Sequence, residues 1–288
     1  MKVWITGATG LCGRAVVEEL TGQFEVLPTA FSRAGGNIMK VDLTSTEAVS
    51  EFFDVHKPDA LVHLAAERKP DICEKNKELT DSLNVDATER LAKLCKEYDC
   101  WFLYLSTDYV FDGTKPPYKT DDKPNPLNYY GQSKLKGEEV TLKVNDSAAV
   151  LRVPVLYGQV EDLGESAVTS IAKLLQNQKE SKVDHWATRF PTLVDDIAKV
   201  ISKMLPVRPA GVFHYSGEEA ITKYETAVFM AELMELSSEH LIAEPNQTGT
   251  ALRPKNARLD TSTIKDSGFY VEPTPFRDVL EKILQPHL

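Results

Sequence analysis

Three glycines that directly follow the first apolar segment constrain this chain more than any other feature. Residues 3–6 have the length and composition of a short strand, and residues 11–20 have the apolar spacing of a helix. Gly7, Gly10 and Gly13 follow one another at intervals of three residues through the turn and into the helix. In a strand–turn–helix unit these glycines permit a tight turn, a close approach to a pyrophosphate and close helix packing. The alternative is a plain turn, but the context favours a dinucleotide-binding loop.

Apolar strands alternate with helical segments through the first half of the chain. We expect strands at residues 3–6, 24–31, 60–65, 101–106 and 148–153, and helices at 11–20, 45–55, 71–98 and 127–144. Such units are joined by right-handed crossovers and give a parallel sheet with helices on both faces. The sequence therefore predicts an α/β fold, a Rossmann-type doubly wound parallel sheet, over residues 1–156.

The regular alternation ends near residue 157. Further strands are expected at residues 189–192 and 211–215, mixed with helices at 194–204, 223–234 and 275–284. We interpret residues 157–288 as a smaller mixed α/β lobe that binds a substrate or partner and is partly interleaved with the sheet. A chain of 288 residues is long enough for two such units.

Composition limits the partners and the compartment. The formal net charge of −10 argues against nucleic acid, because phosphate binding requires clustered lysine and arginine. No apolar run reaches about 18 residues, so we expect no membrane span. The four cysteines have no CxxC spacing and predict reduced thiols in the cytoplasm. The six histidines form no HExxH or HxH pair, so no protein-built metal site is expected.

The end of the second strand indicates which dinucleotide the loop would bind. An NAD site usually has an acidic side chain there, on the ribose hydroxyls. This sequence has Phe31, Ser32 and Arg33 instead, with no carboxylate. Arg33 is suited to pair with a 2′-phosphate, although a solvated loop charge is the alternative. We therefore expect NADP.

A tyrosine–lysine pair on one helix is the candidate for chemistry. Among ten tyrosines, only Tyr130 is followed four residues later by a lysine, Lys134, which places both on one helix face. A phenol is a poor proton donor at neutral pH unless a nearby ammonium stabilises the phenolate. Thr107, at the end of a strand, is placed to polarise a substrate carbonyl. Taken alone, the pair is also compatible with a surface helix.

The segments TGATGLCG, STDYVFDGT and YYGQSK, in this order, resemble the extended short-chain dehydrogenase/reductase superfamily and, within it, the dTDP-4-dehydrorhamnose reductase group. The later segments LRVPVLYG, GVFHYSG and RPKNARLD, together with AAERKPD, resemble the family of methionine adenosyltransferase regulatory β subunits. The resemblance covers nearly the whole chain.

The resemblance implies a Rossmann domain with bound NADP, a smaller lobe over the nicotinamide end, and a defined set of cofactor contacts. It places Thr9, Gly10, Leu11 and Cys12 at the phosphates, Phe31, Ser32 and Arg33 at the 2′-phosphate, Asp42 and Leu43 at the adenine, and Leu64, Arg68, Tyr130, Lys134 and Leu156 along the remainder. For Arg68, a surface charge at a helix entry is the alternative.

Two functions follow from the resemblance. The favoured one is an NADP-binding regulatory subunit that associates with the methionine adenosyltransferase catalytic subunit and tunes S-adenosylmethionine synthesis. The alternative is an NADPH-dependent dTDP-4-dehydrorhamnose reductase, a reductase of 4-keto nucleotide sugars. In it Tyr130 would donate the proton, Lys134 would lower the phenol pKa and Thr107 would hold the carbonyl. A third interpretation is an NADP-occupancy sensor with another partner.

Two departures from these families point in opposite directions. The rhamnose-pathway reductases carry an aromatic residue where this chain has Val155, which argues against nucleotide-sugar reduction. The regulatory subunits extend past the last helix with a basic, aromatic tail that engages the catalytic subunit. This chain ends at His287-Leu288 without such a tail, which argues against that docking mode. Because Tyr130 and Lys134 also bind cofactor in a protein that never turns over, they do not decide between the functions.

Overall fold

The first strand, β1 (Lys2–Thr6), has apolar side chains on both of its faces. Val3 and Ile5 pack into one core layer, and Trp4 packs into the layer on the opposite side. Successive side chains of a strand point to opposite faces, so a strand that buries both must be covered on both sides. The sequence of β1 therefore already implies a three-layer α/β/α arrangement.

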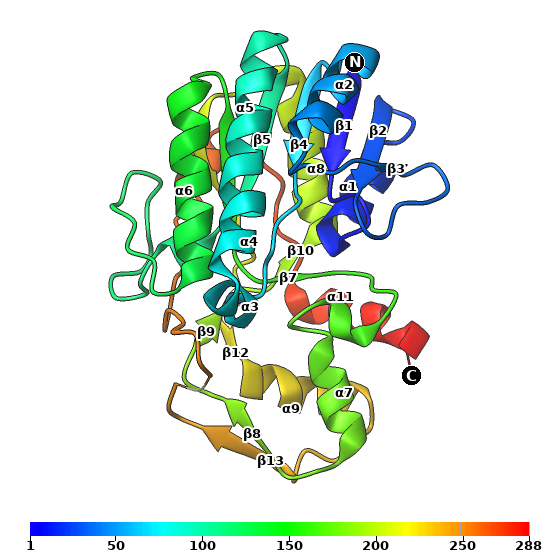
Figure 1. Cartoon of the computed structure of the whole chain (residues 1–288). Helices are drawn as coiled ribbons and strands as arrows, with labels where there is room; N and C mark the ends of the chain where they lie inside the picture. Colours follow the sequence, from blue (N-terminus) through cyan, green and yellow to red (C-terminus); the bar gives the residue numbers. More distant parts are fainter. Residues whose placement is uncertain (248, 288) are drawn as a thin grey trace.

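Seven parallel strands form the main sheet of the computed structural model, which describes residues 1–247 and 249–287 (Figure 1). Leu288, named above at the chain end, lies outside the described residues. The strand order is β11-β6-β5-β4-β1-β2-β3, so the direction of winding reverses between β1 and β4. The other strands are β2 (Glu25–Ala30), β3 (Met39–Lys40), β4 (Ala60–His63), β5 (Trp101–Thr107), β6 (Ala149–Val153) and β11 (Gly211–His214). This confirms the predicted doubly wound parallel sheet, whose switch point is the usual place for a ligand.

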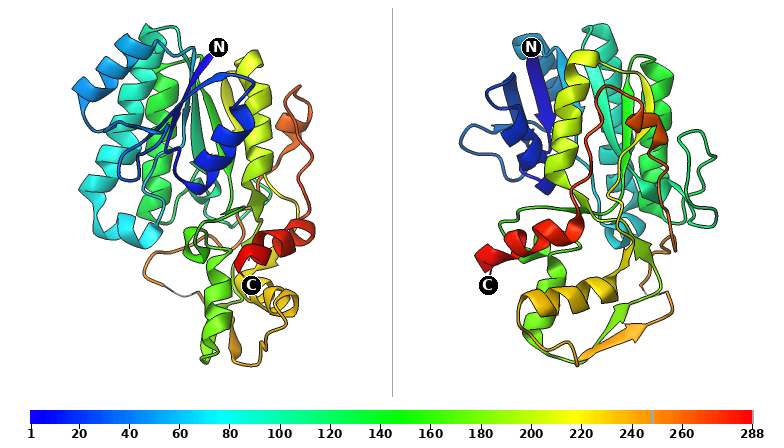
Figure 2. Two further views of the ribbon diagram at one scale, coloured as in Figure 1. Left: turned by 90° about the vertical axis from the view of Figure 1, so that its right-hand side faces the viewer. Right: turned by 180° about the vertical axis from the view of Figure 1, so that it is seen from behind.

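Helices cover both faces of the sheet, as Figures 1 and 2 show. On one face α1 (Leu11–Leu20) and α8 (Val194–Val207) pack against each other and on the sheet. The other face is covered by α2 (Thr46–His56), α5 (Ala87–Glu97) and α6 (Tyr129–Val144). The helices therefore separate the main core into two apolar layers.

The helix expected over residues 71–98 is interrupted, which corrects that prediction. The segment consists of α3 (Pro70–Lys75), α4 (Lys77–Asp81), a π-helical turn η1 (Ser82–Asp86) and α5. Asn76 interrupts the helix with φ −128° and ψ 64°. In the π-helical turn, the Asn84 side chain accepts a hydrogen bond from Glu67 N (2.9 Å) and donates one to Glu67 O (3.0 Å). These bonds bind the turn to the loop after β4, a long-range contact that helical periodicity does not encode.

The strand expected at residues 189–192 is also corrected. It is two short strands, β9 (Thr188–Arg189) and β10 (Thr192–Leu193), with different partners. β9 pairs antiparallel with β12 (Ile221–Thr222), and β10 pairs parallel with β7 (Leu156–Tyr157). Pro191 lies between them, and proline has no N–H to donate to a continuous ladder.

The smaller lobe lies below the carboxyl ends of the main strands in Figure 1. Its core is formed by side chains such as Leu175, Met230 and Leu280. They come from α7 (Ser170–Asn177), α9 (Lys223–Leu233) and α11 (Phe276–Leu284), next to the parallel pair β8 (Ser181–Asp184) and β13 (Leu241–Glu244). The remaining elements are α10 (Ser262–Lys265) and the short turns η2 (Asp108–Val110), η3 (Leu163–Glu165) and η4 (Gln285–His287).

The chain returns to the large sheet after residue 156. β11 pairs with β6, and α8 packs on α1, although both follow the predicted boundary. The interleaving of the second half with the sheet is therefore visible in the pairing of the strands. The division into units at 156/157 stays a prediction.

A buried ion pair joins α6 to the sheet. Arg152 of β6 donates to both carboxylate oxygens of Glu138 of α6, with Nε–Oε1 and Nη2–Oε2 distances of 3.0 and 2.6 Å. The side chains are only 5% and 3% exposed. Ser106 of β5 donates to the same carboxylate, and His214 Nε2 of β11 lies 3.2 Å from Arg152 Nη1. Burial lowers the pKa of His214 to about 3, so this ring is neutral and adds no second positive charge.

We expect Glu138→Gln to lower the free energy of unfolding by about 3–5 kcal/mol, because it leaves the Arg152 guanidinium buried without a counter-charge. The matched control is Asp146→Asn. Asp146 pairs with Lys96 at the surface, where the two side chains are 83% and 53% exposed. Because solvent screens this exposed pair, its loss should leave the free energy of unfolding almost unchanged. Urea unfolding measures the free energy of unfolding of both variants. Equal losses in the two would contradict the role given to the buried pair.

Candidate functional site

One cavity of about 770 Å³ lies at the carboxyl ends of the main strands, between the two lobes. The structure brings every candidate site residue named from the sequence to its wall. They are Gly7, Thr9, Gly10, Leu11, Cys12, Gly13, Phe31, Ser32, Arg33, Asp42, Leu43, Leu64, Arg68, Thr107, Tyr130, Lys134 and Leu156. Their placement is now known, while the role of each stays a prediction.

The glycine loop packs too closely for side chains at two of its positions. Gly7 has a φ of +69°, and a Cβ there would lie 2.9 Å from Ala65 N. A Cβ on Gly13 would lie 2.1 Å from Gly7 O. The first turn of α1 contains no acidic side chain, and no side chain caps its Gly10 end. No acidic side chain and no capping side chain therefore compete for the positive end of the helix dipole, which suits a phosphate.

The end of β2 forms the second part of the cavity wall. Phe31 is 56% exposed, with the Lys40 ammonium 5.4 Å from its ring centroid. Among the residues predicted to contact the 2′-phosphate and the adenine, Asp42 is the one that carries a carboxylate. Hydrogen bonds from the Thr44 side chain and backbone lower its pKa. Arg33 lies beside these residues, half exposed.

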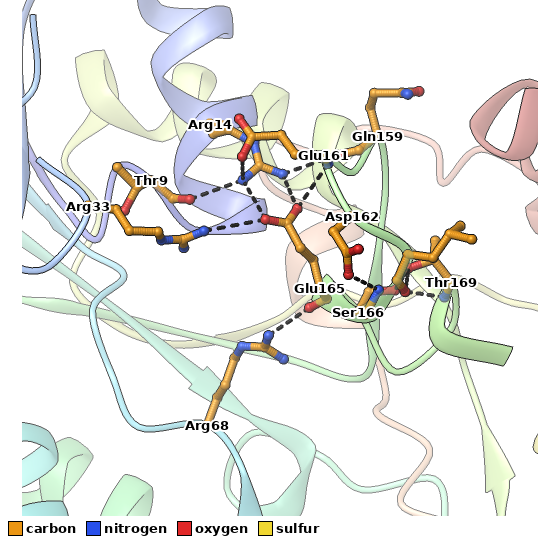
Figure 3. Close-up of polar contacts among 12 residues, drawn as sticks. Thr9, Arg14, Arg33, Arg68, Gln159, Glu161, Asp162, Glu165, Ser166 and Thr169 are labelled. Carbon is orange, nitrogen blue, oxygen red and sulfur yellow. Dashed lines mark hydrogen bonds and ion pairs between the residues drawn. The ribbon is translucent and has the colours of Figure 1, made fainter. Parts of the chain in front are cut away.

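A glutamate that sequence reasoning missed lies among three arginines (Figure 3), and this glutamate, Arg33 and Arg68 line the cavity. The Glu165 carboxylate, at the end of η3, pairs with Arg14 of α1 and with Arg33. Arg68 Nη2 donates to the backbone oxygen of Glu165 at 2.6 Å, and Arg68 lines the cavity although its side chain is exposed. Because Arg14 directly follows the glycine loop in the sequence, its position could have indicated that it lies near this site. No local pattern marks Glu165.

The candidate catalytic side chains lie together, but Lys134 makes a bond of its own. Its Nζ donates to Leu105 O at 2.7 Å and lies 4.0 Å from the Tyr104 ring centroid. Burial lowers the pKa of Lys134 to about 7, although Glu138 opposes the shift. The amine is therefore only partly charged at neutral pH.

The expected lowering of the Tyr130 pKa by Lys134 is not seen. Burial raises the pKa of the Tyr130 phenol, and a hydrogen bond with Thr107 only partly offsets it. The Thr107 hydroxyl lies 3.1 Å from Asp108 Oδ1 and accepts a bond from Tyr109 N at 3.2 Å. In this arrangement Tyr130 is a neutral hydrogen-bonding group rather than an activated acid.

The cavity wall also includes polar residues that the sequence did not indicate as site residues. Asp108, Tyr109 and Arg253 line the cavity. Burial raises the pKa of Asp108 to about 6, against the nearby charge of Arg189. Arg253 pairs with Asp71 at 2.9 Å, across 182 positions of sequence. Only the folded chain brings these groups to the site.

The described residues contain neither a metal-binding cluster nor a membrane-spanning helix. Within residues 1–247 and 249–287, His, Cys, Asp and Glu side chains form no group of three or more that could hold a metal ion. None of the helices in those ranges has the length and apolar character needed to cross a bilayer.

We expect Lys134→Met to change how stability depends on pH. Between pH 7 and about 10, the unfolded chain binds more protons at Lys134 than the folded protein does, so the wild-type free energy of unfolding rises with pH. Relative to Lys134→Met, the slope should reach at most about 1.4 kcal/mol per pH unit. Urea unfolding at several pH values measures it. Equal slopes in the wild type and Lys134→Met would contradict this expectation.

Known proteins match this chain over its whole length. The family model described as the RmlD substrate binding domain matches residues 1–288. Methionine adenosyltransferase 2 subunit beta of Bos taurus is 44% identical over 296 residues, covering 100% of this chain and 88% of that protein.

Solved structures support the fold. A dTDP-4-dehydrorhamnose reductase of Clostridium acetobutylicum superimposes with a TM-score of 0.87 at 28% identity, covering 100% of this chain and 99% of that one. The dTDP-4-dehydrorhamnose reductase of Bacillus anthracis, solved in complex with NADP, has a TM-score of 0.87 at 24% identity and covers 99% of both chains. The resemblance inferred from the sequence is thereby confirmed. The chain belongs to the RmlD substrate-binding family and, within it, to the group of methionine adenosyltransferase 2 beta subunits.

Proposed function

We propose that this protein is an NADP-binding regulatory subunit that associates with the methionine adenosyltransferase catalytic subunit and tunes S-adenosylmethionine synthesis. The observation that carries the proposal is the 44% identity to methionine adenosyltransferase 2 subunit beta over the whole chain. That similarity includes the smaller lobe, whereas a Rossmann half alone is common to many unrelated enzymes. The Clostridium acetobutylicum reductase is 28% identical over the same length.

The cofactor assignment is supported by the chemistry of the cavity. The glycine loop offers backbone amides to a pyrophosphate, and Arg33 lies where an NAD site would have a carboxylate. A guanidinium is suited to a 2′-phosphate because it donates two parallel hydrogen bonds. The NADP complex of the Bacillus anthracis reductase, which has the same fold, adds support.

The state of the candidate catalytic residues favours regulation over turnover. A raised Tyr130 pKa makes the phenol a weaker proton donor, and Lys134 carries only part of a positive charge at neutral pH to oppose that shift. Both remain good hydrogen-bonding groups for a ribose. The four cysteines are free and buried, which supports the proposed cytoplasmic location.

The second candidate function is reduction of a 4-keto nucleotide sugar. It is favoured by the presence of Thr107, Tyr130 and Lys134 on one cavity wall and by the similarity to dTDP-4-dehydrorhamnose reductases. Bound NADPH would supply the hydride. Tyr130 would then donate its proton to the carbonyl oxygen, which the Thr107 hydroxyl would hold. Val155, where those enzymes carry an aromatic residue, offers a sugar less surface for stacking.

Association with the catalytic subunit tests the first function. Calorimetric titration of the NADP-loaded protein into the methionine adenosyltransferase catalytic subunit of the same organism should give a dissociation constant of about 1 µM or lower. The Clostridium acetobutylicum reductase is the matched control, because it shares the fold and should give no heat. Absence of binding, with separate elution on size exclusion, would contradict the regulatory function.

Substitution of Tyr130 tests the second function. If the protein is a reductase, Tyr130→Phe should lower the rate of NADPH oxidation with dTDP-4-dehydrorhamnose by about 100-fold or more, because the proton donor is lost. The regulatory function predicts equally slow oxidation by the wild type and the variant. Oxidation of NADPH followed by absorbance distinguishes the two. Cofactor titration of both proteins shows whether the phenylalanine variant still binds.

A further inference from the structure

The segment 159–169, here called the strap, lies at the edge of the cavity and joins the two lobes. It follows β7, contains η3 and leads into α7 of the smaller lobe. Its residues Glu165, Ser166 and Ala167 line the cavity. The strap contacts Arg14, Arg33 and Arg68, three side chains that come from different parts of the large lobe (Figure 3).

The Glu165 carboxylate occupies a complete anion-binding site. Arg14 Nη2 lies 2.5 Å from Oε2, and Arg14 Nη1 lies 3.3 Å from Oε1. Arg33 Nη1 lies 3.4 Å from the same Oε1, and the backbone N–H of Glu161 donates to Oε2 at 3.2 Å. The Glu161 carboxylate is more distant, with its Oε2 3.9 Å from Arg14 Nη1. Two guanidinium groups and an amide thus converge on one carboxylate.

Glu165 is held in this position by the strap itself. Asp162 Oδ1 accepts hydrogen bonds from Gly164 N at 2.7 Å and from Lys173 Nζ at 2.6 Å. On the other side, the Ser166 hydroxyl accepts from Thr169 N at 2.9 Å. The residues on both sides of Glu165 are therefore fixed by local bonds, and its side chain is only 16% exposed. Burial alone would raise the pKa of Glu165, but hydrogen bonding to Arg14 and the charges of Arg14 and Arg33 lower it, so the group is a carboxylate at neutral pH.

One of the donors that hold Glu165, Arg33, is the cavity residue that we expect to bind a 2′-phosphate. Arg33 stands at the end of β2, where the ribose of a bound dinucleotide lies in a doubly wound sheet. A carboxylate on Arg33 neutralises part of its charge and repels a second anion at close range. Arg33 and Arg68, both predicted cofactor contacts, are thus engaged by one residue of the strap. A 2′-phosphate bound by Arg33 would compete with the Glu165 carboxylate for this guanidinium.

We propose that Glu165 is an internal anion that occupies the 2′-phosphate pocket between Arg14 and Arg33, so that NADP binds only as the strap releases these arginines. The inference rests on the proposed binding of NADP and deepens it. Glu165 would set the affinity of the pocket and couple cofactor binding to movement of the strap. Through α7, that movement would reach the smaller lobe.

The test is titration of the intact protein with NADPH and with NADH. Glu165→Gln keeps the shape of the side chain and removes the charge that competes with the phosphate. It should lower the dissociation constant for NADPH by about tenfold or more. The change for NADH, which lacks the 2′-phosphate, should stay below about threefold. In the double variant Glu165→Gln/Arg33→Ala, the gain for NADPH should be lost.

Glu161→Gln is the matched control, because Glu161 is a glutamate of the same strap with a side chain 72% exposed. It should change NADPH affinity less than about twofold. Urea unfolding of each variant verifies that it is folded.

Three outcomes would count against the proposal, and they are distinguishable. If the wild type binds NADPH and Glu165→Gln binds it equally or more weakly, Glu165 is not a competing anion, while the cofactor assignment stands. An equal gain for NADPH and NADH would place the competition at the shared pyrophosphate and overturn the 2′-phosphate assignment. If neither the wild type nor Glu165→Gln binds NADPH, the proposed cofactor function fails together with this inference.

Discussion

The buried ion pair between Glu138 and Arg152 is the interaction on which the geometry of the site depends. It joins α6 to β6, and through Ser106 and His214 it also connects β5 and β11. Glu138 lies one helical turn beyond Lys134, so the same bond that anchors α6 also determines where Lys134 and Tyr130 face the cavity. A charged pair in an apolar sheet is stable only when both partners are present and hydrogen-bonded, as they are here.

Burial also decides the protonation states of Lys134 and Tyr130. The low-dielectric environment favours the neutral form of Lys134 and of Tyr130, which moves their pKa values in opposite directions. Lys134, with a pKa of about 7, can still exchange a proton, and both side chains can form hydrogen bonds to the ribose of a cofactor. The candidate residues are thus compatible with retention of a cofactor, as the regulatory function that we propose requires. This physical argument agrees with the similarity to methionine adenosyltransferase 2 subunit beta.

The charges around the strap connect the cofactor pocket to the smaller lobe. Glu165 lies beside arginines of the large lobe, although its strap leads into α7. In a regulatory subunit, a link of this kind gives a bound dinucleotide a way to alter a surface that a partner contacts. The free energy available for such a change is the difference between the binding free energies of the arginines for a phosphate and for a carboxylate.

Local rules allowed the sequence by itself to determine the sheet, the loop and most of the site. Gly7 and Gly13 follow from steric limits on a single turn, and the alternating apolar runs follow from burial on both faces of a parallel sheet. These rules act over a few residues, so they are readable without a structure. The family resemblance supplied the remaining cavity residues, including Arg68 and Leu156.

Only the tertiary structure decided the contacts that give these residues their chemistry. Arg14 and Glu165 are separated by 151 positions, and Arg33 and Glu165 by 132, so no local pattern relates them. The bond from Lys134 to Leu105 O likewise depends on how α6 lies on β5. Spacing in the sequence placed the lysine and the tyrosine on one helix face. Desolvation by the folded chain, which spacing does not encode, determined their charge states.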